Sequence, residues 1–379
     1  MQITKYQYRD PGENGWVFNE VDFGKINLLV GESGMGKTRL LNTIFNIGSM
    51  TASKKIGFGH WSLDLEVHGV KYNWQVDAES DEQRRAVVSS ERLTRYESGS
   101  AKSIVTRNAE QLIFNGKELP KLSRTESCIS LLQEENDIQP LYKGFSSILR
   151  RNFFDADLTK ICRFAGYPFG LLDKLTKNEN LRDLFPTLHS EEMNLNSIMY
   201  ILSKGFPEVF GKISKIYKSI FPFIVDVRVM DVQELEKDIK LPGQIPVFCV
   251  KEKGVEAWIT LNDLSSGMQK ALLILTDIFT LPQGSIYLVD EYENSLGVNA
   301  INFFPNLLLE EDFDIQFFIT SHHPYIINKI PVANWYVLHR IGSQVKILSG
   351  DRLQKRLGTS KQQAFIKLMN DSFFTEGKE

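Results

Sequence analysis

Cysteine is scarce in this sequence: the 379 residues include only Cys128, Cys162 and Cys249. Their odd number and wide spacing argue against a disulfide framework and against a clustered metal site. Long apolar runs are also missing, because Asp277 and Pro282 interrupt the one stretch that approaches the roughly 18 residues needed to cross a bilayer. The N-terminal segment lacks the apolar core of a signal peptide and reads as a strand, so we expect a cytoplasmic protein.

Net charge and repetition are nearly absent as well. The formal charge is -3 and 42% of the residues are hydrophobic, which is typical of a globular protein without a broad basic surface. The sequence shows no internal repeat and no sustained heptads, so we expect no long coiled-coil arms. Its length fits one large domain with insertions or two ordinary domains.

What the sequence does contain is a glycine-rich loop between a strand and a helix. The apolar residues 26–30 predict a buried strand, and the apolar spacing over residues 40–45 predicts a helix that ends at Gly48. Between them, GESGMGKT fits the pattern G-x-x-x-x-G-K-[ST], in which backbone N–H groups curl around phosphate. The predicted nucleotide-binding residues are Gly31, Glu32, Ser33, Gly34, Met35, Gly36, Lys37 and Thr38.

Two residues of this loop have specific expected roles. Lys37 would reach the β- and γ-phosphates of a nucleotide, and the Thr38 hydroxyl would ligate Mg²⁺. The alternative is a glycine-rich turn that binds nothing.

A second acidic motif follows another apolar run. Residues 285–289 predict a buried strand, which places Asp290 at its carboxyl end as a carboxylate ligand of Mg²⁺. Side chains alternate along a strand, so Glu291 is free to face an attacking water once the chain turns. The alternative is that this acidic pair merely begins a surface loop.

Two further strand ends carry polar side chains. The predicted strand over residues 315–319 leads to His322, which could donate a hydrogen bond to a γ-phosphate, and to His323, which we interpret as held by its neighbours. SCISLLQ predicts a buried strand that ends at Gln133, whose amide could ligate Mg²⁺ or position water. A surface role is the alternative for Gln133.

The remaining segments suggest two insertions. Residues 58–114 contain alternating runs typical of antiparallel strands, interrupted by the polar stretch DEQRRAVVSSERLTRYESGSAKS, which we expect to be a mobile excursion. Residues 139–220 predict a helical insert with the runs FSSILRRNFF, LTKICRFAGY, NSIMYILSK and FGKISKIYKSIF. A second antiparallel stretch then leads to LSSGMQK, where Ser265, Ser266 and Gly267 precede a predicted helix over residues 268–279. An ordinary helix N-cap is the simple interpretation of these three residues.

The ordered set GESGMGKT, ISLLQ, LSSGMQK, IYLVDEYENSLG and FFITSHHP resembles the ATP-binding-cassette (ABC) class of ATPases. The resemblance spans residues 20–340 and is closer to the RecF/SMC-like and OLD-like branch, similar to the ATPase subunits of Septu- or PARIS-type anti-phage systems. It implies an α/β P-loop NTPase fold with a mixed sheet, an antiparallel β subdomain and a helical insert. It also implies a dimer that sandwiches ATP and Mg²⁺, with the signature motif of one subunit closing on the γ-phosphate held by the other.

Carried onto this sequence, the resemblance makes Lys37 and Thr38 the Walker A residues, Gln133 the Q-loop, Asp290 the Walker B carboxylate, Glu291 the catalytic base and His322 the switch histidine. Ser265, Ser266 and Gly267 would contact the partner's ATP, and residues 294–297 fall at the D-loop. The sequence departs from the family in three places. Ser266 stands where the signature usually has glycine, Met268 where it has glutamine, and Tyr292 where proline is common.

We therefore expect a single ABC-type ATPase domain. Its parts are a Walker A lobe (1–138, with the β-rich insertion 57–120), a helical insert (139–220), a signature lobe (221–340) and a helical tail (341–379). Only roughly 55 residues follow His322, fewer than a usual domain, so we expect the ATPase to regulate a separate effector such as a nuclease in anti-phage defence. The alternative is a RecF-like repair ATPase that binds duplex DNA directly; a membrane transport ATPase is disfavoured.

Overall fold

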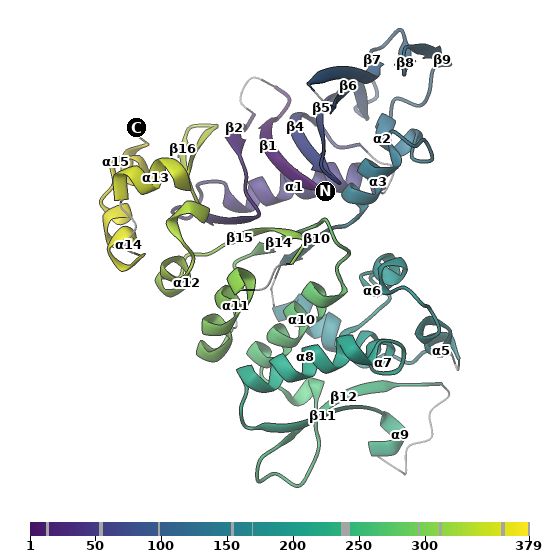
Figure 1. Ribbon diagram of the computed structural model, residues 1–379, viewed down its shortest axis with the longest axis vertical. Coiled ribbons are helices and arrows are strands. Elements are labelled where there is room, and N and C mark those ends of the chain that lie inside the picture. The colour runs from purple at the N-terminus through teal and green to yellow at the C-terminus, as the bar shows by residue number, and fades with distance from the viewer. Residues whose placement is uncertain are drawn as a thin grey trace. The chain divides into compact units, whose positions relative to one another are not determined.

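The computed structural model describes residues 1–12, 15–52, 56–97, 99–152, 155–168, 170–235, 243–294, 296–310, 313–357 and 361–377. The chain forms two compact units (Figure 1). Unit 1 consists of Met1–Arg151, Gln283–Tyr292 and Asp312–Glu379, and unit 2 of Asn152–Pro282 and Glu293–Glu311.

The centre of unit 1 is a set of parallel strands. In sheet order they are β14 (Ser285–Asp290), β15 (Ile315–Thr320), β3 (Ile26–Val30) and β16 (Trp335–Ile341), with β10 (Ile148–Asn152) beside β14. Every residue of β3, β14 and β15 is buried, as the continuous apolar runs predict for a sheet covered on both faces. The expected α/β fold with a mixed sheet is confirmed.

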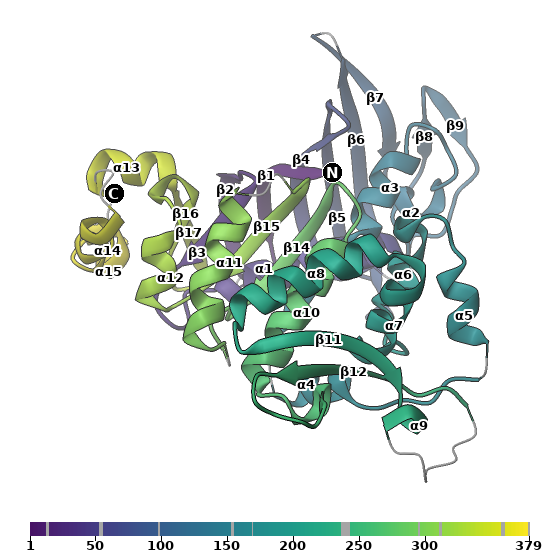
Figure 2. The same ribbon diagram turned by 60° about the horizontal axis from the view of Figure 1, so that its bottom comes forward.

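The same sheet continues beyond β16 as a mostly antiparallel region. Its strands are, in sheet order, β17 (Gln344–Ser349), β2 (Val17–Asp22), β1 (Gln2–Arg9), β4 (Gly59–Val67), β5 (Val70–Ser80), β6 (Ala86–Glu97), β7 (Ser100–Arg107), β8 (Leu112–Phe114) and β9 (Lys117–Leu119). Figure 2 shows β5, β6 and β7 as long neighbouring strands at one end of this unit. The predicted antiparallel insertion is confirmed.

The polar stretch within the insertion was predicted wrongly. It contains the whole of β6 and the start of β7 rather than a mobile excursion. One face of this hairpin is buried through Val88 and Leu93, while its other face is polar and open. A half-exposed antiparallel strand needs apolar residues only on alternate positions, so its composition alone looks like that of a loop.

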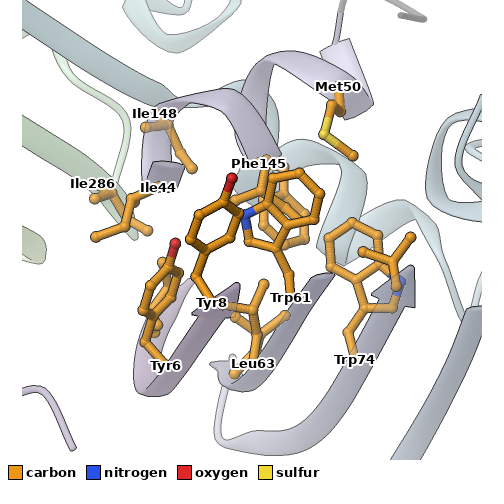
Figure 3. Packing of buried hydrophobic residues seen from close by; sticks show 14 of the residues in the cluster. Tyr6, Tyr8, Ile44, Met50, Trp61, Leu63, Trp74, Phe145, Ile148 and Ile286 are labelled. Atoms are coloured by element: carbon orange, nitrogen blue, oxygen red, sulfur yellow. The ribbon is translucent and has the colours of Figure 1, made fainter. Parts of the chain in front are cut away.

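The buried face of the antiparallel strands packs against helices α1 (Lys37–Ala52) and α3 (Gln139–Ser146). Figure 3 shows Trp61 and Trp74 of adjacent strands beside Phe145 of α3. The rings of Trp74 and Phe145 have centroids 5.0 Å apart, and the Tyr6 hydroxyl donates to Thr43 Oγ1 over 2.7 Å. Large aromatic side chains therefore supply much of the apolar burial that joins the helices to the sheet.

Gly48 does not end α1, which runs to Ala52. A Cβ on Gly48 would approach Ile148 Cδ1 to 2.8 Å, so the missing side chain lets β10 pass close to the helix. The prediction of a C-cap at Gly48 was wrong because a packing glycine and a capping glycine are alike in sequence.

Two short apolar runs of unit 1 took the opposite structure to the one predicted. SCISLLQ forms helix α2 (Cys128–Leu131), capped by Ser127, whose hydroxyl accepts from Ser130 N. Gln133 follows in a turn, so the argument that placed it at a strand end beside the metal is removed. The run FSSILRRNFF was predicted as helix, but its centre is strand β10. Periodicity cannot separate helix from strand in runs this short.

The C-terminal part of unit 1 begins as sheet and ends as helices. Residues 344–349, predicted as the start of a helical tail, form β17, which pairs with β16 because the two make a tight hairpin at Gly342. The helices of this part are α12 (Pro324–Lys329), η3 (Val332–Asn334), α13 (Gly350–Leu357), α14 (Lys361–Met369) and α15 (Ser372–Glu376). Figure 1 shows α13 to α15 grouped beside β16.

Unit 2 is built from helices and a small antiparallel sheet. Its elements are α4 (Asp155–Cys162), α5 (Leu171–Thr176), η1 (Leu181–Leu184), α6 (Phe185–Leu188), α7 (Leu195–Gly205), α8 (Pro207–Ile220), β11 (Ile224–Asp231), α9 (Val232–Leu235), β12 (Pro246–Glu252), β13 (Ile259–Thr260), η2 (Leu261–Asp263), α10 (Ser266–Thr280) and α11 (Val298–Glu310). Helices α7 and α8 lie along β11 and β12 (Figure 2). The helices predicted around 196–204, 210–221, 268–279 and 300–309 are confirmed. The helix predicted over 158–167 is confirmed only as far as Cys162, because Tyr167 forms an isolated β-bridge to Gln244 instead.

All three cysteines are buried, Cys128 in unit 1 and Cys162 and Cys249 in unit 2. Burial raises the pKa of the Cys162 and Cys249 thiols to about 12 and also raises that of Cys128. No helix in the described part of the chain is long and apolar enough to span a bilayer.

Candidate nucleotide site

The glycine-rich loop connects β3 to α1, as predicted. Gly34 and Gly36 have φ angles of 84° and 97°, a conformation that favours glycine. A Cβ on Gly36 would meet the Trp16 ring at 2.7 Å, so this glycine also makes room for the indole. The Lys37 ammonium donates to the carbonyls of Gly31 and Glu32 over 2.7 and 2.9 Å. The lysine is thus held at the centre of the loop that it would share with phosphate.

A hydrogen-bond network joins the loop to the end of β14. The hydroxyls of Thr38 and Thr320 both donate to Asp290 Oδ1, over 3.2 and 2.7 Å. Thr320 Oγ1 in turn accepts from Glu291 N over 2.7 Å. Three separate segments, α1, β14 and β15, therefore meet at one buried carboxylate. Thr320 was not singled out from the sequence, because a threonine ending an apolar strand carries no distinctive signal.

The Thr38 and Asp290 oxygens fit a magnesium ion. Ligands about 2.1 Å from an octahedral Mg²⁺ lie about 3.0 Å from each other, close to the 3.2 Å between Thr38 Oγ1 and Asp290 Oδ1. In the described residues no group of three or more His, Cys, Asp and Glu side chains could hold a metal on its own. Two protein oxygens would leave the other positions around an octahedral Mg²⁺ for water or phosphate.

Glu291 lies directly after β14 with φ 47°, in the left-handed region that glutamate seldom adopts. This turn lets Glu291 line the same hollow as Asp290, although the two are consecutive. A strained backbone of this kind costs roughly 1–3 kcal/mol and occurs preferentially at functional sites.

The site is a hollow of about 370 Å³ in unit 1. Among the predicted residues it collects Ser33, Gly34, Gly36, Lys37, Thr38, Asp290, Glu291 and His322. Gly31 and Glu32 contribute carbonyls to Lys37, and Met35 Sδ accepts from Arg340 N. Gln133 is not among the lining residues. His323 caps α12 through its ring, accepting from Tyr325 N, in line with the interpretation that its neighbours hold it.

The hollow also contains residues that the sequence did not indicate. Trp16, Arg39 and Asn42 line it. The Trp16 ring lies between two guanidinium groups, with the Arg39 and Arg340 carbons 5.1 and 4.8 Å from its centroid. Asp10 pairs with Arg39 and accepts from Trp16 N, which ties both Asp10 and Trp16 to the start of α1. Tertiary packing brings Trp16, Asp10 and Arg340 to the loop, whereas Arg39 and Asn42 follow it directly in α1.

Arg150 is another missed neighbour. It projects from β10, and its guanidinium lies 3.9 Å from Asp290 Oδ2. Burial lowers the pKa of Arg150, while the charge of Asp290 opposes that change. Arg150 was not predicted to lie here, because its segment was predicted as helix.

A larger hollow, about 540 Å³, lies on the open face of the antiparallel strands. It contains none of the predicted site residues. Glu91 and Arg107 are among its lining residues, and their buried charged groups are 3.5 Å apart. Burial raises the pKa of Glu91, and Arg107 opposes this. The convergence of phosphate loop, carboxylates and histidine makes the smaller hollow the candidate site.

The signature residues lie in unit 2, at the start of α10. Ser265 caps this helix, its hydroxyl accepting from Met268 N over 3.4 Å, so the simple N-cap interpretation holds. Ser265 and Ser266 are exposed, whereas Gly267 is buried. The predicted contact of these three residues with a partner's ATP stays a prediction.

The first turn of α10 is fixed by buried polar contacts within unit 2. The Tyr217 hydroxyl donates to Met268 O, and Gln269 Nε2 donates to Leu261 O. Lys270 is fully buried, and its ammonium donates to Asn294 O over 2.5 Å. A buried ammonium requires such partners. Lys270 thereby links the first turn of α10, called the signature turn below, to Asn294.

A family model described as "AAA domain, putative AbiEii toxin, Type IV TA system" matches residues 198–328. The matched segment includes the signature turn, Asp290, Glu291 and His322, and it lies in the same chain as a complete phosphate loop beside a parallel sheet. The fold is that of a P-loop ATPase. The search of curated proteins found no match.

The chain is also similar to three solved structures of SMC head domains. One Smc head bound to the C-terminal winged-helix domain of ScpA is 15% identical, with 92% of this chain and 97% of that chain covered and a TM-score of 0.47. The Smc head with an extended coiled coil, bound to the C-terminal domain of ScpA derived from Pyrococcus furiosus, is 15% identical, with coverages of 94% and 98% and a TM-score of 0.49. The SMC head domain from Thermotoga maritima is 14% identical, with coverages of 92% and 99% and a TM-score of 0.40.

Proposed function

We propose that this P-loop protein binds and hydrolyses ATP with Mg²⁺ in the hollow of unit 1, and that two copies dimerise around the nucleotide. We further propose that the dimer is a sensor or regulatory assembly subunit of a bacterial anti-phage defence system and controls a separate effector. The observation that carries the ATPase proposal is the Asp290 network. It puts a Mg²⁺-type carboxylate, the Thr38 hydroxyl and the turned Glu291 in one hollow.

The roles of the residues follow from their chemistry. Lys37 and the first amides of α1 neutralise the phosphates. Thr38 and Asp290 hold Mg²⁺, which when bound polarises the phosphoryl oxygens. Glu291 accepts a proton from the attacking water, and His322 donates a hydrogen bond to the γ-phosphate. No structural argument remains for the proposed metal role of Gln133, because the segment predicted as a strand before it forms helix α2.

The dimer proposal rests on the exposed serines of unit 2. Ser265 and Ser266 are accessible at the N-terminus of a 15-residue helix, whose partial positive charge favours anions. Serine hydroxyls and free helix N–H groups there would close on the γ-phosphate held by a second copy. Since ADP lacks that phosphate, ATP favours the closed dimer and hydrolysis releases it.

The defence role is supported by the family description, which names an AbiEii toxin of a type IV toxin–antitoxin system. The surface of the antiparallel sheet favours an effector over direct duplex DNA binding. On that face the Lys5 ammonium pairs with the Glu20 carboxylate, so a basic side chain is matched by an acidic one. A DNA groove needs an excess of basic side chains.

The test is the oligomeric state of a hydrolysis-deficient variant. Glu291→Gln should bind ATP and form a dimer by light scattering with Mg²⁺ and ATP, but not with ADP. Lys37→Ala should stay monomeric in both nucleotides because the loop loses its phosphate-binding cation. Exposed Lys71→Ala provides a matched control that keeps wild-type behaviour. If Glu291→Gln binds ATP and remains a monomer, the dimer proposal is wrong; if it does not bind ATP, the nucleotide site is wrong.

A further inference from the structure

The two oxygens of the Asp290 carboxylate have different neighbours. Oδ1 accepts hydrogen bonds from the Thr38 and Thr320 hydroxyls. Oδ2 lies 3.9 Å from the guanidinium of Arg150. The carboxylate that would hold Mg²⁺ thus already faces a protein cation on its second oxygen.

Arg150 is poorly satisfied as a structural arginine. Its side chain is 16% exposed, and its Nε is buried without a hydrogen-bond partner among the described residues. A well-built buried ion pair has close, bidentate contacts that use the guanidinium donors. The long contact to Asp290 has neither feature. Stabilisation of unit 1 is therefore a weak explanation for an arginine in this place.

The position of Arg150 has a direct electrostatic consequence for a divalent cation. A positive charge near a metal ligand repels the ion and stabilises the carboxylate in its absence. Because Arg150 is absent from the lining of the nucleotide hollow, it acts on Asp290 from behind rather than on the phosphates. Its effect should fall on Mg²⁺ and much less on the nucleotide.

We propose that Arg150 is a built-in competitor of Mg²⁺ for Asp290, neutralising this carboxylate in the nucleotide-free protein and raising the Mg²⁺ concentration that the site requires. This inference rests on the proposed ATP and Mg²⁺ site. It makes Arg150 a positioning residue that sets the threshold for Mg²⁺-dependent nucleotide binding. The guanidinium must give way when Mg²⁺ and the triphosphate arrive together.

The chain provides a matched control on the same strand. Arg151 is the next residue of β10, and alternation along a strand directs its side chain to the opposite face. Arg150→Gln and Arg151→Gln remove the same charge one residue apart. Arg150→Lys keeps the charge on a shorter, more flexible stem.

The experiment measures equilibrium binding of a fluorescent, non-hydrolysable ATP analogue while Mg²⁺ is titrated. Arg150→Gln should reach half-saturation at roughly 3- to 30-fold lower Mg²⁺ than wild type, because one neighbouring charge changes such affinities by this order. Arg151→Gln should stay within about twofold, and Arg150→Lys should fall between Arg150→Gln and wild type. Analogue affinity without Mg²⁺ should change little in all variants. A merely structural role of Arg150 would not produce tighter Mg²⁺ binding.

An unchanged or higher Mg²⁺ requirement in Arg150→Gln overturns the inference, because Arg150 would then be neutral or would help to orient Asp290. If Arg150→Gln does not fold by circular dichroism, Arg150→Met makes the same comparison with a neutral side chain. If the wild-type protein fails to bind the analogue, or binds it independently of Mg²⁺, the proposed function fails and this inference fails with it. Wild-type binding that depends on Mg²⁺, with no shift in Arg150→Gln, overturns the inference alone.

Discussion

Unit 1 and unit 2 present their functional residues in different ways. In unit 1, Asp290, Glu291 and His322 follow buried parallel strands and line one hollow with the phosphate loop. In unit 2, Ser265 and Ser266 are exposed on a helix turn that Lys270 and Tyr217 fix from inside. The residues of unit 1 surround a hollow, whereas the two serines of unit 2 lie on the surface of the chain. Under the proposed function, each chain would supply two incomplete halves of a nucleotide site.

The contrast between the two units depends on each having a hydrophobic core that can be destabilised without the other. Trp74→Ala removes a fully buried indole from unit 1 and should cost about 3–5 kcal/mol of unfolding free energy. The rate of thiol labelling under native conditions measures the opening of each unit separately. Cys128 reports on unit 1, and Cys162 and Cys249 report on unit 2. Cys128 should be labelled much faster in the variant, with the unit 2 thiols little changed. Tyr96→Ala, on the exposed side of the same sheet, is the control; equal acceleration of all three thiols would mean one cooperative core.

The converse change addresses unit 2. Lys270→Ala deletes a buried side chain and leaves the Asn294 carbonyl without its donor, at a cost of about 2–4 kcal/mol. Labelling of Cys162 and Cys249 should speed up, and Cys128 should keep its wild-type rate. Exposed Lys253→Ala controls for loss of a lysine from the same unit. Wild-type labelling of Cys162 and Cys249 in Lys270→Ala would show that Lys270 does not hold the signature turn.

The smallest expected effect is a dependence of stability on pH. Burial raises the pKa of Cys162 and Cys249 to about 12. A raised folded-state pKa contributes stability that is fully present below the unfolded value of about 8.5 and is lost as pH rises toward the folded value. At pH 9.5, ionisation of each thiol in the unfolded chain should therefore lower the free energy of unfolding of unit 2 by about 1 kcal/mol. The measurement is the urea midpoint, which should fall. In Cys162→Ala the loss of stability at high pH should be smaller, because one of the two thiols is gone. The same pH profile as in wild type would contradict the attribution of this loss to the buried thiols.

The features that could be predicted from the sequence are those that neighbouring residues determine. β3, β14 and β15 were predictable because each is a continuous apolar run followed by a polar motif, and a run buried on both faces needs no partner information. The roles of Thr38 and Asp290 follow from their neighbours in sequence. The secondary-structure predictions for the segments around Gln133 and Arg150 were wrong because a run of four to eight apolar residues fits either helix or strand.

The missed site residues were beyond reach for a related reason. Trp16, Thr320 and Arg150 come to the loop from distant segments, and each is an ordinary residue in its own stretch. Lys270 reads as a surface lysine until the fold shows it buried. Packing between segments that are far apart in the sequence leaves no pattern in periodicity or composition.

The most direct test of the central claim mixes two inactive variants. Lys37→Ala disables the phosphate loop of unit 1, and Ser266→Arg blocks the exposed signature turn of unit 2. If a nucleotide is shared between copies, the mixture contains dimers in which an intact loop meets an intact signature turn, so ATP hydrolysis should appear that neither variant shows alone. If the mixture is as inactive as its components, or if Ser266→Arg alone hydrolyses ATP at the wild-type rate, the two units do not complete each other's site across a dimer.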